Sequence, residues 1–196
     1  NQIKAIQTLC IALTLFLFTA FPVFSQWVQQ VSGTNNNLLA VYFLNENTGF
    51  LGSNTNIPYQ YNGGEIIKTV NGGVSWNRVL LDSNLRTKDF YFFDNNNGIA
   101  VGGSFGSVGF IYKTFDGGIT WLNVTPVNLN SHLWNIDFVN ANTGYIAGKY
   151  GILKSTNAGN NWELIWNFPF FPGSAPWPKV DFFDSFTGLY AADTGI

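Results

Sequence analysis

Short apolar runs alternate with polar turns rich in Gly and Asn along most of this chain. At four places an apolar residue stands two positions before a phenylalanine, and these residues are Val41, Phe90, Ile136 and Val180. Such alternation predicts a β-strand that carries the apolar pair on one face. No stretch within residues 27–196 has the spacing of an amphipathic helix. The pattern therefore predicts an all-β chain.

Each of these strands leads into the same turn, a phenylalanine followed after five residues by a glycine. The four glycines are spaced 44 to 49 residues apart, at Gly49, Gly98, Gly144 and Gly188. A short apolar run follows each glycine, and a second run ending in lysine follows three of them, at Lys68, Lys113 and Lys154. Self-similarity at this period indicates a repeat architecture.

A second phrase, which we call the box hairpin, closes three of the repeats. A hydroxyl, a carboxamide or carboxylate, a glycine and a tryptophan recur in order: Thr69, Asn71, Gly73, Trp76; Thr114, Asp116, Gly118, Trp121; and Ser155, Asn157, Gly159, Trp162. The polar side chains can bond backbone N–H groups of a tight turn, and glycine permits positive φ. The closing tryptophan is expected to be a buried anchor.

One more apolar run follows each tryptophan, which gives four short strands per repeat. Four strands in a repeat of this length form one blade of a β-propeller. We therefore predict a partial propeller of about three and a half to four blades over residues 26–196. Its expected parts are a strand at 26–31, repeats at about 38–80, 87–125 and 133–166, and an incomplete repeat at 178–196.

The box hairpins resemble the Asp-boxes of BNR-type propellers. Together with the phenylalanine–glycine turn, they make residues 27–196 similar to the photosystem II stability/assembly factor-like family. Two boxes carry Asn71 and Asn157 where that family often has Asp. The third also has Ala158 for a glycine and Asn161 for a threonine, so its turn is expected to be looser.

Trp27 stands 14 residues before Val41, the same spacing as from Trp76 to Phe90. Residues 26–31 are therefore expected to form the outermost strand of a blade whose other strands lie beyond the sequence. A blade built from both ends of a chain closes the ring and protects the sheet edges. The alternative is an ordinary leading strand.

Residues 1–25 have a different composition, with Lys4 followed by an almost uninterrupted apolar run from Leu9 to Phe21. This layout is typical of a secretory signal peptide, and predicts a secreted or periplasmic protein without a membrane span in its mature part. The alternative is an N-terminal anchor, although the run is shorter than the roughly 20 residues of a span. Cys10 is the only cysteine, so disulfides and thiolate metal sites are not expected.

The net charge of −2 lacks the basic surplus of nucleic-acid binders, so no nucleic-acid partner is expected. His132 is the only histidine, and it is interpreted as a loop residue before Trp134. No cofactor and no metal site are predicted.

Asp-box propellers include sialidases and xyloglucanases, so the resemblance allows a catalytic role. A sialidase needs three arginines around the substrate carboxylate, and this chain has only Arg78 and Arg86. Matched positions of the innermost strands carry Tyr42, Tyr91, Asp137 and Asp181. The favoured interpretation is that these side chains line the channel or bond neighbouring backbone, and no catalytic residue is assigned.

The linker after the third box is longer than the others and rich in aromatics and prolines. Four aromatic side chains of this linker are candidate binding residues: Trp166, Phe170, Phe171 and Trp177. The four inner-strand residues named above are candidate binding residues as well. Exposed aromatic patches mark partner sites, but this linker can equally fold over the blade edge as a local lid.

Two functional classes follow from the resemblance. The first, which we favour, is a non-catalytic secreted propeller that acts as an interaction scaffold or assembly factor, with a protein or glycan partner. The second is a glycoside hydrolase or carbohydrate-binding propeller of the sialidase or xyloglucanase type, whose catalytic residues lie mostly outside this sequence.

Overall fold

A computed structural model describes residues 28–54, 63–82, 85–103, 108–167 and 178–191. The chain divides into two units, residues 1–30 and 31–196, and all the strands lie in the second. The described residues form strands and turns, without a helix. The strands are β1 (Asn37–Phe43), β2 (Gly49–Asn54), β3 (Gly64–Thr69), β4 (Asn77–Asp82), β5 (Thr87–Phe92), β6 (Gly98–Gly103), β7 (Gly109–Thr114), β8 (Leu122–Asn123), β9 (Leu133–Phe138), β10 (Gly144–Gly148), β11 (Gly151–Ser155), β12 (Glu163–Asn167), β13 (Lys179–Phe182) and β14 (Gly188–Ala191).

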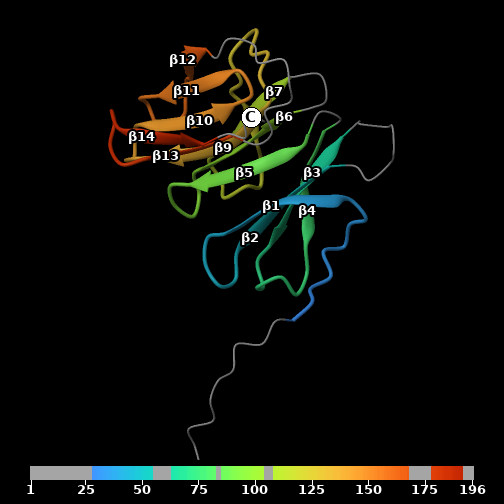
Figure 1. Cartoon of the computed structure of the whole chain (residues 1–196). Coiled ribbons are helices and arrows are strands. Elements are labelled where there is room, and N and C mark those ends of the chain that lie inside the picture. Colours follow the sequence, from blue (N-terminus) through green and yellow to red (C-terminus); the bar gives the residue numbers. More distant parts are fainter. Residues whose placement is uncertain (1–27, 55–62, 83–84, 104–107, 168–177, 192–196) are drawn as a thin grey trace, which may run out of the picture. The chain divides into compact units, whose positions relative to one another are not determined.

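These strands form four separate antiparallel sheets, each a simple meander (Figure 1). The orders are β1-β2-β3-β4, β5-β6-β7-β8, β9-β10-β11-β12 and β13-β14. We call them blades 1 to 4. The first strand of each blade contacts the first strand of the next, so β1, β5, β9 and β13 lie side by side as the innermost strands. The predicted partial β-propeller is confirmed.

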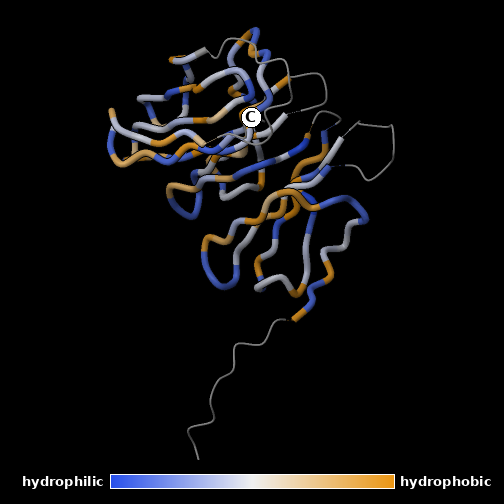
Figure 2. Tube along the Cα trace, viewed as in Figure 1, coloured by the Kyte–Doolittle hydropathy of each residue, from blue (hydrophilic) through white to orange (hydrophobic). Residues whose placement is uncertain are grey.

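Each of blades 1 to 3 packs one flat face against the blade that follows it, which explains why strands carry apolar residues on both faces. Three buried clusters fill the three joints between successive blades. At the first joint Phe50 of β2 stacks on Phe92 of β5, with ring centroids 4.6 Å apart. At the second, Tyr91 of β5 lies 4.7 Å from Phe138 of β9. Figure 2 shows that apolar segments lie in the strands and that polar residues lie in several of the turns.

The box hairpins have one hydrogen-bond pattern. The first hydroxyl accepts from the glycine N–H four residues later: Gly73 N to Thr69 Oγ1 at 2.9 Å, Gly118 N to Thr114 Oγ1 at 2.8 Å, and Gly159 N to Ser155 Oγ at 2.9 Å. The third box keeps these bonds although Ala158 has φ +57°. Its turn is therefore not looser, because alanine accepts the strained conformation that glycine adopts in the other two.

The tryptophans of the boxes are buried to different extents. Trp162 is 7% exposed and donates from Nε1 to the Gly159 carbonyl at 3.2 Å. Trp76 and Trp121 are only half-buried, so the expectation of three fully buried anchors is wrong. Trp76 packs edge-on against Phe43, which is itself 44% exposed.

Two other parts differ from expectation. The outer strand of blade 2, β8, contains two residues, because the chain turns away at Pro126, which has no backbone N–H to pair. In the predicted strand at 26–31, the described residues 28–31 are not in a strand. Ring closure through that segment stays a prediction.

Candidate functional site

The tyrosines predicted to face the channel lie in the joints between blades. The ring of Tyr42 lies 5.4 Å from Phe92 of the next blade, and Tyr91 packs on Phe138. Both side chains are half-buried. Burial and the neighbouring Tyr42 and Asp137 raise the pKa of Tyr91. Both tyrosines are occupied by packing contacts.

Carboxylates and a carboxamide of the innermost strands bond the backbone of the next innermost strand. Asp137 Oδ2 accepts from the N–H of Phe182 at 3.1 Å, and Asn135 Oδ1 accepts from the N–H of Val180 at 2.9 Å. The same device joins blades 2 and 3, where Asp89 Oδ2 accepts from the N–H of Ile136 at 3.1 Å. A carboxylate held in this way links neighbouring innermost strands.

Asp89 was not singled out from the sequence, although it makes the same bond between innermost strands as Asp137. Burial raises the pKa of its carboxyl, while hydrogen bonds from Ile136, Asn135 and Phe90 oppose that shift. Asp181, which holds in blade 4 the position that Asp137 holds in blade 3, is exposed. The structure thus does not pair Asp137 and Asp181 as facing acids.

A different group of side chains gathers where the innermost strands begin. A cavity of about 260 Å³ is lined by one matched position from each of the four blades and by the residue after the last of these: Leu39, Lys88, Trp134, Pro178 and Lys179. Lys88 Nζ lies 4.6 Å from the centre of the Trp134 ring. His132 stacks on Trp134 with centroids 4.7 Å apart. We call Lys88, His132, Trp134, Lys149 and Lys179 the mouth cluster.

Positive charge dominates the mouth cluster. Burial lowers the pKa of Lys88 to about 8, and the positive charge of Arg86 adds to the effect. Burial also lowers the pKa of His132 to about 4, with further contributions from Lys88, Arg86 and Lys149. His132 is therefore neutral at pH 7, and the cations around it create a local positive potential despite the net charge of −2.

This arrangement can bind an anionic group beside an aromatic ring. Ammonium groups supply charge-assisted hydrogen bonds to a carboxylate, and Trp134 offers an apolar surface held in place by His132. Sequence reasoning missed the site because its members lie about 45 residues apart along the chain. The repeat pattern contained a signal for the site, because Lys88 and Trp134 hold the same position in their repeats. Each stands two positions before an inward-packing residue, Phe90 or Ile136.

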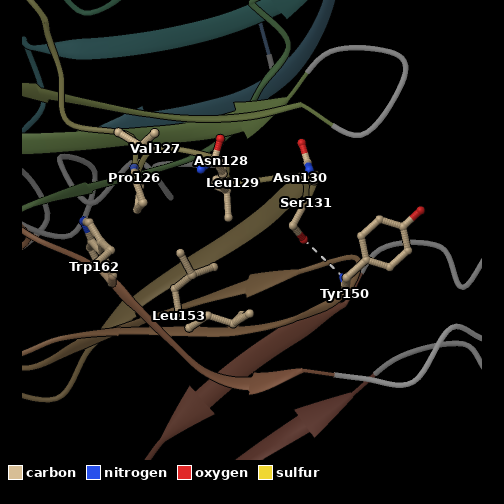
Figure 3. Close-up of a pocket in the computed structure, with 10 residues that line it drawn as sticks. Pro126, Val127, Asn128, Leu129, Asn130, Ser131, Tyr150, Leu153 and Trp162 are labelled. Atoms are coloured by element: carbon tan, nitrogen blue, oxygen red, sulfur yellow. Dashed lines mark hydrogen bonds between the residues drawn. The ribbon is translucent and has the colours of Figure 1, made fainter.

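A second cavity lies at the rim, between the linker 126–131 and blade 3 (Figure 3). Its volume is about 570 Å³, and Leu153 and Trp162 contribute apolar surface to it. The Ser131 Oγ accepts from the backbone N–H of Tyr150 at 3.1 Å, which fixes one end of the linker. No residue of its lining is charged.

The aromatic linker is only partly described. Trp166 lies on β12 with 54% of its surface exposed. Phe170, Phe171 and Trp177 lie outside the described residues. Within the described ranges, no three His, Cys, Asp or Glu side chains come close enough to hold a metal ion, and none of the chain's elements is a helix able to cross a bilayer.

Comparison with known families decides the assignment. Residues 69–178 match the family described as photosynthesis system II assembly factor YCF48. The chain belongs to this family. The matched residues cover more than half of the chain and include all three box hairpins. No curated protein sequence is significantly similar to it.

Solved structures agree on the fold. YCF48 bound to a D1 peptide has a TM-score of 0.53 and 19% identity over 74% of this chain, and YCF48 from Cyanidioschyzon merolae has 0.54 and 17% over 84%. An ancestral GH74 enzyme has 0.56 and 26% over 76%. This chain spans 45%, 50% and 21% of those three proteins. It thus corresponds to half of each propeller or less.

Proposed function

We propose that this member of the YCF48 family is a non-catalytic interaction scaffold, and that its mouth cluster binds an acidic segment of a partner protein. The observation that carries the proposal is the convergence of Lys88, Lys149 and Lys179 around the Trp134–His132 stack. A similar propeller, YCF48, has been solved with a D1 peptide, which supports a protein partner for this chain.

The inner-strand acids support a non-catalytic role. Hydrolysis of a glycosidic bond needs two carboxyl groups free to act on either side of the bond. Here Asp137 accepts a backbone N–H, and its counterpart Asp181 is exposed. The likeness to a GH74 enzyme keeps a carbohydrate-binding or hydrolytic propeller as the alternative, with its catalytic groups outside this sequence.

The test is binding of a fluorescent peptide of alternating Asp and Ala, followed by anisotropy at low and at physiological salt. The double variant Lys88→Gln, Lys149→Gln should weaken binding at least tenfold, and added salt should weaken binding to the unmodified protein. Arg78→Gln, compared with Lys149→Gln alone, is the control that removes one positive charge elsewhere, on the outer strand β4, where Arg78 pairs with Glu65. Equal binding by both variants would contradict the proposal.

The alternative is tested on the same preparation. We expect no turnover on a panel of glycans that includes xyloglucan and sialosides. Turnover that is abolished by Asp137→Asn or Asp181→Asn would contradict the scaffold proposal and support the glycoside hydrolase.

The proposed localisation is secreted or periplasmic, with residues 1–25 removed as a signal peptide. Its support is the apolar run from Leu9 to Phe21 behind Lys4. Expression of the chain behind its own leader, followed by N-terminal sequencing of the exported protein, tests it. Retention of the leader on the exported protein would favour the anchor.

A further inference from the structure

The rim of the propeller has the same niche at two joints between blades. At the joint of blades 1 and 2, a cavity of about 140 Å³ is lined in part by Asp82, Gly109, Tyr112 and Asn123. At the joint of blades 2 and 3, the cavity of about 570 Å³ is lined in part by the residues that hold the same positions in the next repeat, which are Val127, Tyr150, Leu153 and Leu164. In each pair the two residues stand equally far from the box tryptophan of their own repeat. We call these two sites the small and the large rim cavity.

Aromatic rings fill most of the niche at the small rim cavity. Strand β7 supplies the rings of Phe110 and Tyr112, with centroids 5.3 Å apart. The Tyr112 hydroxyl donates to Asp82 Oδ2 at 2.9 Å. Burial and the Asp82 carboxylate raise the pKa of Tyr112 to about 12, so this phenol is uncharged at neutral pH. The niche is therefore shaped to hold an uncharged aromatic ring.

The large rim cavity lacks these two rings. On β11 the positions of Phe110 and Tyr112 are held by Gly151 and Leu153. The outer strand β8 is also short, because the chain turns away at Pro126. The difference between about 570 and about 140 Å³ agrees with the loss of the two aromatic side chains.

The linker that covers the large rim cavity is fixed at both ends. Thr125 Oγ1 accepts from the N–H of Ile111 at 2.8 Å, and Ser131 Oγ accepts from the N–H of Tyr150 at 3.1 Å. Between these two bonds Asn128 has φ 66°, a conformation that asparagine adopts more readily than most residues. The fold itself therefore holds this cavity open, as is usual for sites of small ligands.

The lining of the large rim cavity is apolar inside and polar at its opening. Leu153 is 1% and Trp162 7% exposed, and Figure 3 shows Leu153 beneath the linker with Trp162 to one side of it. Asn128 and Asn130 contribute exposed carboxamide groups. No charged residue is among the described residues that line it, and an ion buried without a partner is costly. The cavity therefore suits a neutral ring that carries a hydroxyl.

We propose that the large rim cavity binds a small uncharged aromatic molecule of the phenol or benzyl alcohol class. Its ring takes the place that the Tyr112 ring has in the small rim cavity, and packs on Leu153 and Trp162. The linker amides bond its hydroxyl. The volume of about 570 Å³ lies within the range of about 300–1,000 Å³ that is usual for small-molecule sites. This site goes beyond the proposed function, because no residue of the mouth cluster lines it.

Fluorine NMR of 4-fluorophenol, titrated with the full chain at neutral pH, tests the proposal. The signal of the probe should broaden on binding, with a dissociation constant of about 1 mM or below, as expected for a ligand of this size. Benzyl alcohol should displace the probe about tenfold better than benzylammonium, because the ammonium group finds no partner in the cavity.

Two variants at the cavity have matched controls at one exposed leucine of β4. Leu153→Tyr should weaken binding by about tenfold or more, because it adds the ring that Tyr112 supplies in blade 2. Leu164→Ala removes part of the lining at a position that is 47% exposed, so folding is expected to be kept, and it should weaken binding about threefold. Leu81→Tyr and Leu81→Ala make the same changes at a site that is 62% exposed, and both should bind like the unmodified chain.

The blocked tripeptide N-acetyl-Ala-Tyr-Ala-amide distinguishes a free aromatic molecule from a tyrosine side chain of a partner protein. It should displace the probe less well than p-cresol does, because the covering linker leaves the cavity the size of a small-molecule site. Tighter binding of the tripeptide, an unchanged probe signal with the unmodified chain, or binding that survives both Leu153→Tyr and Leu164→Ala would overturn the proposal. Loss of acidic-peptide binding at the mouth cluster would not affect these results, because the two sites share no lining residue.

Discussion

Lys113 of blade 2 reaches into blade 3, where its Nζ donates to the carbonyl oxygen of Ala158 at 2.6 Å. The same lysine bonds Asn160 Oδ1 at 2.7 Å. Lys68 makes the matching bond to the Gly117 carbonyl at 2.7 Å, and Lys154 donates to the Ser185 carbonyl of blade 4 at 3.2 Å. Each of these three lysines therefore joins its blade to a turn of the next blade through a hydrogen bond. We call Lys68, Lys113 and Lys154 the fastening lysines.

Lys113→Met should lower the free energy of unfolding by about 1.5–3 kcal/mol, the cost of losing hydrogen bonds to a charged group. The side chain is 3% exposed, so water cannot replace the lost bonds. Urea unfolding followed by tryptophan fluorescence measures the change. Lys179→Met, at an exposed position of β13, is the control and should change stability by less than about 0.5 kcal/mol. Equal effects at both positions would contradict the fastening role.

Trp162→Ala should destabilise the protein by about 3–5 kcal/mol, as for other large buried aromatics. Trp76→Ala should cost clearly less, because Trp76 is only partly buried and makes an edge-on contact with a partly exposed phenylalanine. Thermal and urea unfolding of the two variants, measured at one protein concentration, give the comparison. An equal loss would mean that Trp76 is covered as completely as Trp162.

Gly118→Ala should be among the most damaging single changes in a box hairpin. Gly118 has φ +78°, and an added Cβ would lie 2.4 Å from the Phe50 ring of the preceding blade. We expect a backbone cost of about 1–2 kcal/mol and an overpacking cost of about 1–3 kcal/mol.

Gly33→Ala is the matched control for Gly118→Ala, because Gly33 has φ +74° and open space around the added Cβ. It should show the backbone cost alone. The difference in unfolding free energy between the two variants therefore isolates the contact with Phe50. If the two losses are the same, the joint between blades 1 and 2 is looser than described.

His132 should titrate with a pKa of about 4, well below its usual 6.5. Between these values the unfolded chain binds more protons than the folded one, so stability rises with pH through this window and falls as the pH is lowered. We expect a loss of roughly 1–3 kcal/mol between pH 6.5 and 4, after allowing for solvent screening.

The ring proton signal of His132, the only histidine in the chain, can be followed by NMR against pH. His132→Phe keeps an aromatic ring on Trp134 and removes the titrating group, so its stability should depend less on pH over the same window. A midpoint near 6.5 would show that the ring is solvated and that the positive potential around the mouth cluster is weak.

Much of the fold could be predicted because residues that lie close together in the sequence determine its strands and turns. Each strand–turn pair, such as Phe92 to Gly98, lies within a few residues, and the spacing of Trp121 and Trp162 gave the repeat. The mouth cluster could not be predicted, because Lys88 and Trp134 meet only when two blades pack together.

His132 shows the same limit. Its isolation in the sequence indicated a loop residue, whereas its stacking on Trp134 and its low pKa both arise from packing. The exposure of Phe43 also depends on which blades surround it, which no local pattern records.

The fastening lysines have a consequence for how such a protein gains repeats by duplication. Each lysine binds a main-chain carbonyl of a turn, and Lys113 binds the side chain of Asn160 as well, so the contact that the three lysines share depends on the path of the backbone. A duplicated segment of one period would carry both its own lysine and its own turn, and could join at either end without compensating mutations. Contacts between neighbours therefore set how units are joined, and the curvature of the ring sets how many fit.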